Sequence, residues 1–242
     1  MKRLLSLFLA LALPAAGQSL VFGGATSHRV NVTQNATIDS LDPFTYCTWI
    51  YPTTITDQRY IIGKLNTSNG RHLDLHINGA AGDILAVVDR TTPVVYTATG
   101  NPLATTNKWY FACVTFNSAG AAGSLMHLYV GDLETLAVDV SVFASDGSGA
   151  YISDANGPLI IGNNRTNLSS FQGRIATSQY VAAELTLGQI RALQFRPRSI
   201  EGTRLLTRLG ANGTSTQADL SGKGNAGTVT GATLGAGLGI AP

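Results

Sequence analysis

Asn107 to Phe116, N-K-W-Y-F-A-C-V-T-F, is the stretch that decides the fold of this chain. It is rich in β-branched and aromatic residues, which suit a pleated sheet surface, and polar turns bound it. One parity is apolar (Ala112, Val114, Phe116), while Trp109, Phe111, Cys113 and Thr115 share the other parity. The alternation predicts a central, half-buried β-strand.

A second stretch, Phe44 to Tyr51, has the same length and the same residue types, with Cys47 and Trp49 on one parity. Strands that match in length and in aromatic content are typical neighbours in an antiparallel sheet. The two cysteines of the chain, Cys47 and Cys113, are therefore predicted to face each other across neighbouring strands.

Further strands are predicted wherever short β-branched runs alternate with Gly, Asn and Ser turn clusters. They are Leu20–Phe22, Arg29–Val32, Arg59–Leu65, His72–Ile77, Ile84–Asp89, Val94–Ala98, Met126–Val130, Val138–Phe143, Leu159–Gly162, Gly173–Ala182 and Thr228–Leu234. Many short strands at close spacing predict an all-β, two-sheet antiparallel β-sandwich. One short helix is expected over Thr186 to Leu193, with Thr186 as its N-cap.

The N-terminal segment has the pattern of a secretory signal peptide. Lys2 and Arg3 precede an apolar run from Leu4 to Leu13, and the small residue Gly17 suits a cleavage site. We expect residues 1–17 to be removed and residues 18–242 to form a single domain. The run is too short to span a bilayer, so no membrane contact is expected after cleavage.

The charge balance does not imply a general affinity for polyanions. Without Lys2 and Arg3 the chain has 14 basic and 14 acidic side chains, and only 12% of its residues are charged. A nucleic-acid partner would need a basic patch, so none is expected. The one basic cluster, Arg196, Arg198, Arg204 and Arg208, is interpreted as a solvated face.

The order of several motifs resembles the laminin-G-like and pentraxin-like domains of the concanavalin A-like lectin/glucanase superfamily. The matching segments are Phe44-Thr45 with Trp49-Ile50-Tyr51-Pro52, Trp109 with Val114-Thr115-Phe116, Ile161-Gly162 with Phe171-Gln172-Gly173-Arg174-Ile175, and Glu184-Leu185-Thr186 with Gln189-Ile190. The resemblance implies a jelly-roll sandwich and a secreted or cell-surface recognition domain that binds a glycan or a cell-surface partner.

The resemblance also implies a disulfide between Cys47 and Cys113, because pentraxins join the corresponding strands in this way. Two cysteines at matching strand positions of an exported chain favour a bridge on general grounds as well. Two buried free thiols are the alternative, since a cross-strand bridge requires a specific separation of the Cα atoms.

The calcium site and the catalytic residues of the superfamily are not carried over. The loop that precedes Phe171 contains Asn163, Asn164 and Asn167 but no carboxylate, and Ca²⁺ usually needs charged oxygen ligands. A different calcium site, with Asp146 and Asp154 in the glycine-rich loop, is retained as a hypothesis. The three glutamates, Glu134, Glu184 and Glu201, lack the alternate spacing of a glycosidase strand, so we expect no enzyme.

The segment His72-Leu73-Asp74-Leu75-His76 is the most regular polar pattern in the chain. On a strand, His72, Asp74 and His76 share one face, which we interpret as a solvent-exposed polar face. Contacts to a sugar are an alternative, with Tyr151 as a further candidate ligand residue, and a metal site is another. Successive residues on that face lie about 6–7 Å apart, which makes convergence on one metal ion difficult.

Two further features concern the surface of an exported protein. The six N-x-S/T sequons are candidate glycosylation sites: Asn31, Asn35, Asn66, Asn164, Asn167 and Asn212. The C-terminal stretch Thr228–Leu234 either closes the sandwich or pairs with a sheet edge of a second copy. The competing function is therefore a structural subunit of an extracellular filament or virion surface that assembles through edge strands.

Overall fold

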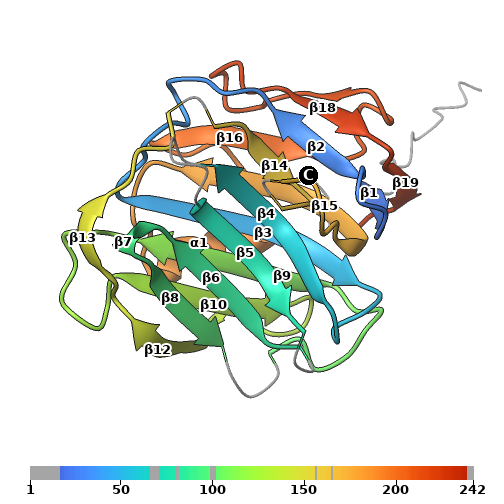
Figure 1. Ribbon diagram of the computed structural model, residues 1–242. Coiled ribbons are helices and arrows are strands. Elements are labelled where there is room, and N and C mark those ends of the chain that lie inside the picture. Colours follow the sequence, from blue (N-terminus) through green and yellow to red (C-terminus); the bar gives the residue numbers. More distant parts are fainter. Residues whose placement is uncertain are drawn as a thin grey trace, which may run out of the picture.

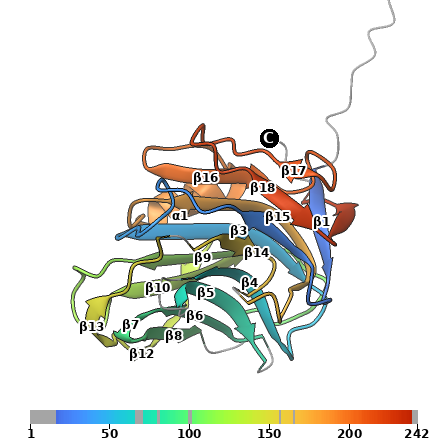
Figure 2. The same cartoon turned by 45° about the horizontal axis from the view of Figure 1, so that its top comes forward.

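A computed structural model describes residues 17–65, 71–79, 82–98, 102–155, 157–164 and 166–238. In these residues the chain folds into two antiparallel sheets that stack face to face, with one helix, α1 (Leu187–Phe195) (Figures 1 and 2). The predicted all-β jelly-roll sandwich is therefore confirmed. The signal peptide predicted over residues 1–17 lies outside the described residues except for Gly17.

The first sheet has the order β11-β10-β9-β3-β15-β1-β19, and β16 also pairs with β15. Its strands are β11 (Val138–Asp139), β10 (Met126–Asp132), β9 (Tyr110–Phe116), β3 (Phe44–Pro52), β15 (Gln172–Val181), β1 (Gln18–Gly23), β19 (Thr233–Ala236) and β16 (Thr203–Arg208). β1 and β16 pair with successive halves of the same edge of β15. The predicted central strands, β3 and β9, are neighbours at the middle of this sheet.

The second sheet has the order β12-β8-β6-β5-β4-β14-β2-β18-β17. Its strands are β12 (Ser141–Ser145), β8 (Val94–Ala98), β6 (Ile84–Val88), β5 (Arg71–Asn78), β4 (Gln58–Leu65), β14 (Leu159–Ile161), β2 (Arg29–Val32), β18 (Gly227–Thr230) and β17 (Thr216–Gln217). A small two-stranded sheet joins β7 (Arg90–Thr92) to β13 (Ser148–Tyr151).

The predicted strands occur close to their expected positions, with two informative exceptions. The stretch Val138–Phe143 divides into β11 and β12, which lie at the edges of different sheets. Asp139 causes this break, because its Oδ1 accepts a hydrogen bond from the backbone N–H of Ser141 at 2.9 Å and turns the chain. The stretch Thr228–Leu234 likewise divides into β18 and β19, at a turn where Gly231 has φ +70°.

Four short strands lie outside the predicted ones: β7, β13, β16 and β17. β16 is the largest omission. Its sequence, T-R-L-L-T-R, has two adjacent leucines between polar residues, which is a poor match to strict alternation. Leu205 and Leu206 are both buried, because β16 packs against the rest of the molecule on both of its faces.

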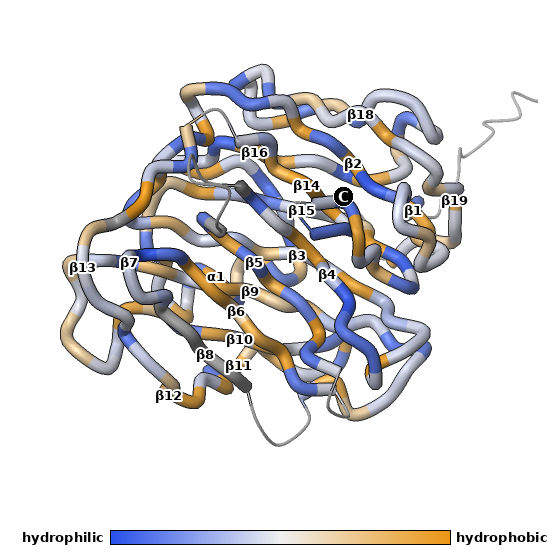
Figure 3. The backbone as a smooth tube through the Cα atoms, in the orientation of Figure 1, coloured by the Kyte–Doolittle hydropathy of each residue, from blue (hydrophilic) through white to orange (hydrophobic). Residues whose placement is uncertain are grey.

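The main hydrophobic core lies between the two sheets. Phe44, Tyr46 and Ile50 of β3 meet Leu75 and Ile77 of β5 in this layer. Figure 3 shows hydrophobic residues concentrated in the strands at the centre of the molecule. Burial of such side chains contributes about 25 cal/mol per Å² of apolar surface, which makes this layer the main source of stability.

A second core lies on the outer face of the first sheet, beneath α1. Trp49 and Phe111 pack there with Ile190 and Leu193 of the helix, and the indole N–H of Trp49 donates to the backbone oxygen of Gln194 at 2.7 Å. All seven residues of β9 are therefore buried. The expectation of a half-buried strand was wrong, because the helix covers the face that alternation had assigned to water.

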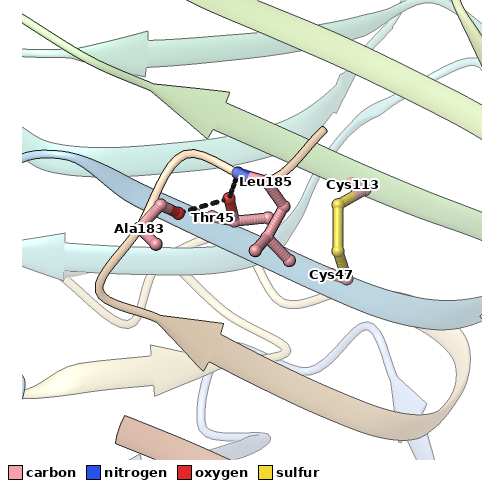
Figure 4. The surroundings of a disulfide bond; sticks show 5 residues. All are labelled: Thr45, Cys47, Cys113, Ala183 and Leu185. Carbon is pink, nitrogen blue, oxygen red and sulfur yellow. Dashed lines mark hydrogen bonds between the residues drawn. A yellow bond between two sulfur atoms is a disulfide. The ribbon is translucent and has the colours of Figure 1, made fainter. Parts of the chain in front are cut away.

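Cys47 and Cys113 form a disulfide, as predicted, between directly paired residues of β3 and β9 (Figure 4). The bridge closes a loop with a sequence separation of 66 residues. On the chain-entropy model, closing a loop of this length stabilises the folded state by about 4 kcal/mol. The disulfide therefore fixes the central strand pair, on which both cores are built.

We predict that the double substitution Cys47→Ala and Cys113→Ala lowers the free energy of unfolding by up to about 4 kcal/mol, because the unfolded chain regains loop entropy. Urea denaturation with and without a reducing agent measures the effect. The reductant should destabilise the natural protein and leave the variant unchanged. Equal stability of the oxidised protein and the variant would contradict the prediction.

Candidate functional site

An open groove of about 840 Å³ lies beside α1. Its walls are the helix with the preceding residues 182–185, the segment 198–204 that leads into β16, and the turn at 221–223. Its polar lining residues are Glu184, Gln189, Arg198, Ser199, Glu201, Thr203, Arg204, Ser221 and Lys223. None of its lining residues is aromatic.

The first wall is attached to the central strand β3. Thr45 Oγ1 donates to the carbonyl of Ala183 at 2.7 Å and accepts from the backbone N–H of Leu185 at 3.0 Å (Figure 4). Thr186 then caps α1 as predicted, in a reciprocal capping box with Gln189. These bonds hold the start of the helix two residues along β3 from the disulfide.

The second wall is a turn organised by the carboxylate of Asp219. Its two oxygens accept hydrogen bonds from the backbone N–H groups of Leu206 (3.1 Å), Ser221 (2.9 Å) and Asn225 (2.9 Å) and from Ser221 Oγ (2.8 Å). Burial acts to raise the pKa of Asp219, but these hydrogen bonds outweigh it, so the pKa lies below its ordinary value.

The sequence of this turn, D-L-S-G-K-G-N, follows from its geometry. Gly222 and Gly224 have φ +75° and +80°, a region that side chains disfavour. Asn225 is buried, and its amide donates to the backbone oxygen of Arg204 at 2.6 Å. The turn thus covers the edge of β16 that is not paired with β15, and it holds Lys223 at the rim of the groove.

Three cationic residues line the groove: Arg198 and Arg204 from the segment that leads into β16, and Lys223 from the turn at 221–223. Arg198 and Lys223 are exposed, whereas Arg204 is half-buried. The Nε of Arg204 is buried without a hydrogen-bond partner among the described residues. The predicted basic cluster is therefore divided: Arg196 and Arg208 are solvated, as expected, while Arg198 and Arg204 line a cavity.

Two acidic residues, Glu184 and Glu201, also line the groove and are exposed. Glu184 Oε2 accepts a hydrogen bond from the side-chain amide of Asn117 at 2.8 Å. The groove can therefore hold an anionic group between its cations and hydrogen-bond neutral hydroxyl groups at its rim. Sequence reasoning missed this site, because its residues come from separate segments that share no local motif.

The predicted ligand residues His72, Asp74 and His76 are buried rather than exposed, with exposed fractions of 0%, 0% and 1%. The expectation of a solvent-exposed polar face is therefore wrong. His76 stacks on Tyr60 with ring centroids 4.5 Å apart, and its Nε2 lies 3.2 Å from Gln58 Nε2. A ligand role for these residues stays a prediction.

A β-bulge also separates His72 from the other two residues. Leu73 pairs with Lys64 and Arg71 pairs with Leu65, so His72 is the extra residue on β5. Its ring lies 5.4 Å from that of Phe44, in the core between the sheets. Strict alternation would have placed it on the outer face with Asp74.

The other predicted ligand residues are dispersed. The side chain of Tyr151 lies outside the described residues. Asp146 accepts a hydrogen bond from the backbone N–H of Gly123, whereas Asp154 is buried in an ion pair with Lys64. No group of three potential metal ligands occurs among the residues that the structure describes. A calcium site at Asp146 and Asp154 stays a prediction.

Five of the six predicted glycosylation sites lie in the described residues, and Asn66 does not. Asn212 is exposed, while Asn31, Asn35, Asn164 and Asn167 are half-buried. Asn164 uses its side-chain oxygen to accept from the backbone N–H of Leu168 at 2.7 Å. Glycosylation stays a prediction, for which Asn212 offers the most accessible amide.

The C-terminal strands pair within the chain itself. β18 lies between β2 and β17, so both of its edges are occupied. β19 pairs with β1 at the end of the first sheet. In the described residues no helix is long and apolar enough to cross a membrane.

Comparisons with known proteins agree on the fold. The family model described as the concanavalin A-like lectin/glucanases superfamily, of laminin G type, matches residues 23–191. No curated protein matches the sequence.

Among solved structures, a "putative carbohydrate binding protein" from Bacteroides ovatus is similar with a TM-score of 0.63 and 17% identity. The match covers 91% of this chain but only 60% of that protein. A pentraxin from Limulus polyphemus is similar with a TM-score of 0.59 and 12% identity, over 96% of this chain and 100% of that one. The extracellular region of zebrafish Gpr126/Adgrg6 follows, with a TM-score of 0.57 and 13% identity, over 93% and 27%.

We predict that Asp219→Asn lowers the free energy of unfolding by about 1–2 kcal/mol at neutral pH, because an amide cannot accept all the hydrogen bonds of this turn. Since the folded-state pKa of Asp219 is depressed, its contribution is present above the unfolded pKa and is lost as pH falls through the folded value. Urea denaturation of both proteins should therefore give curves that converge below about pH 4. A difference that persists in acid would contradict this account.

Proposed function

We propose that this chain, which belongs to the concanavalin A-like lectin/glucanases superfamily, is a secreted, non-catalytic recognition domain that binds an acidic glycan in the groove beside α1. The observation that carries the proposal is the convergence of Arg198, Arg204 and Lys223 on one groove. Elsewhere the sequence is close to electrically neutral and sparsely charged, so this local concentration of cations favours an anionic ligand.

The chemistry of the lining suits a carboxylated or sulfated sugar. The guanidinium of an arginine offers a planar fork that matches a carboxylate or sulfate. Gln189, Ser199 and Ser221 add amide and hydroxyl groups that can bind sugar hydroxyls. Without an aromatic platform in the groove, hydrogen bonds and charge must supply the affinity.

The non-catalytic role is supported by the way the two groove carboxylates are placed. A glycosidase needs a pair of carboxyl groups that flank the scissile bond as acid and as base or nucleophile. Glu184 and Glu201 are both exposed, and Glu184 is hydrogen-bonded to Asn117. We assign these two carboxylates a role in ligand selectivity, because they repel a ligand whose anionic group lies at the rim instead of beside the cations.

Two features support an extracellular location, and a third supports a glycan ligand. The signal-like residues 1–17 end directly before β1, which begins at Gln18. The disulfide between Cys47 and Cys113 is typical of proteins from an oxidising compartment. The Bacteroides ovatus structure is titled as a putative carbohydrate binding protein, which supports a glycan ligand at the level of the fold.

We predict that the double reversal Arg198→Glu and Lys223→Glu weakens binding of a sulfated or uronic-acid oligosaccharide at least tenfold, because it replaces two attractive charges with repulsive ones. Isothermal titration calorimetry at low and physiological salt measures the change. Arg208→Glu is the matched control, since Arg208 is exposed on β16 outside the groove. Equal losses in both variants, or binding restricted to neutral glycans, would contradict the groove assignment.

A second function, assembly into a filament or surface layer, is favoured by a different observation. Leu133, Leu136, Val138, Val142 and Phe143 are between 42% and 52% exposed. They lie on and around β11 and β12, which form the edges of the two sheets on one side of the sandwich. Exposed apolar side chains beside unpaired strand edges favour pairing between copies. The assembly surface would then be this edge rather than the predicted stretch Thr228–Leu234.

If the edge drives assembly, light scattering of the purified protein should show a mass that rises with concentration. The substitutions Val138→Lys and Phe143→Lys should then restore a monomer, because a charge on an edge strand blocks pairing. Leu234→Lys on β19 is the matched control, since Leu234 is 46% exposed. A monomer at every concentration of the natural protein would exclude this second function.

A further inference from the structure

Lys64 of β4 is a lysine buried completely inside the sandwich, with an exposed fraction of 0%. It pairs directly with Leu73 of β5, so its side chain points to the core side of the second sheet. Four oxygens surround its Nζ: Asp154 Oδ2 at 2.8 Å, Asp39 Oδ1 at 3.1 Å, and the backbone oxygens of Gly157 at 3.0 Å and Asp154 at 3.4 Å.

The two carboxylates around this amine are also removed from water. The side chain of Asp154 is 0% exposed and that of Asp39 is 9% exposed. The other oxygen of Asp154, Oδ1, accepts a hydrogen bond from the backbone N–H of Ser40. Asp39 Oδ2 accepts from the side-chain amide of Gln34 at 2.9 Å. One ammonium and two carboxylates leave a net negative charge in a nearly dry site, which is costly.

Aromatic side chains close the inner side of the site. His72 Nε2 lies 3.5 Å from Asp154 Oδ2 and 3.1 Å from the hydroxyl of Tyr180. Phe44 packs against the rings of both His72 and Tyr180. A primary amine is thus held against a carboxyl group, in an apolar surrounding, with a second carboxyl group in contact with the same amine nitrogen.

We propose that Lys64 and Asp154 condense into an intramolecular isopeptide bond. The bond that forms joins Lys64 Nζ to Asp154 Cγ, and the bond that breaks joins Cγ to Oδ2, which leaves as water. The reaction consumes one amine and one carboxylic acid and yields one amide and one water molecule, so it needs no oxidant, reductant or co-substrate. The amide removes two of the three buried charges, which favours the product in a nearly dry site.

Two groups around the pair have a place in this reaction. Asp39 accepts a proton from the attacking amine and returns it to the departing oxygen, as a general base and then a general acid. The backbone N–H of Ser40 donates to Oδ1, where negative charge develops in the tetrahedral intermediate, so it acts as an oxyanion donor. Burial lowers the pKa of His72 to about 4, against the opposing effect of Asp154, so its ring is neutral at physiological pH.

The cross-link would join two elements that are distant in the sequence. Lys64 belongs to β4, and Asp154 lies in the segment between β13 and β14. The loop that the cross-link closes overlaps in sequence with the loop closed by the disulfide. The cysteines of that disulfide, Cys47 and Cys113, lie in the other sheet. The disulfide links two strands of the first sheet, and the amide would link β4 of the second sheet to the segment before β14. Unlike the disulfide, the amide withstands reducing agents.

The test is the intact mass of the folded protein, made in a bacterial host without N-glycosylation and reduced before measurement. The N-terminal peptide of a protease digest gives the starting residue. We expect a mass lower than the sequence value by one water molecule, and a branched peptide that joins residues Lys64 and Asp154. A mass equal to the sequence value, in protein shown to be folded by circular dichroism, would overturn the proposal.

Two variants separate the cross-link from a simple ion pair. Asp39→Asn removes the proton carrier but keeps nearly the same side-chain shape. The protein with this substitution should therefore have the full mass expected from its sequence. Asp57→Asn is the matched control, because Asp57 is 60% exposed and pairs with Arg59, and it should keep the lighter mass. A branched peptide between Lys64 and Asp39 would overturn the assignment to Asp154, and a lighter mass in Asp39→Asn would overturn the role of Asp39.

Discussion

The structure depends on the pairing of β3 with β9, two strands that are buried on both faces. A strand pair in this position has no solvent face, so its backbone groups must bond within the sheet and its side chains must pack on two sides. The directly opposed cysteines then join the pair covalently. The core between the sheets and the core beneath α1 both start from these two strands.

The groove follows from the same constraint. Because α1 covers the outer face of β3 and β9, the segments on either side of the helix must pass over the surface of the first sheet. Thr45 fixes the incoming segment, and the turn at Asp219 closes the space beyond the helix on the side of β16. Thr45 on the central strand and Asp219 at the centre of the turn thus position two walls of the groove, although neither residue lines it.

The interior charges illustrate how strongly local irregularity controls chemistry. The β-bulge at His72 turns one residue of the polar pattern into the core, next to the site where Lys64 meets Asp154. Without that extra residue, His72 would share the outer face with Asp74 and His76. Sequence periodicity has no means of placing a bulge, because a bulge depends on the register that the partner strand β4 adopts.

The sequence by itself determined most of the strand content, the central pair and the facing positions of Cys47 and Cys113, because alternation and turn chemistry are local properties. It also determined the capped helix at Thr186, whose capping box spans four residues. Only the tertiary structure decided that the polar face of β5 is buried, that Arg198, Arg204 and Lys223 share one groove, and that Lys64 lies against Asp154. Those juxtapositions join residues up to 90 positions apart, and they depend on how strands are ordered within two stacked sheets.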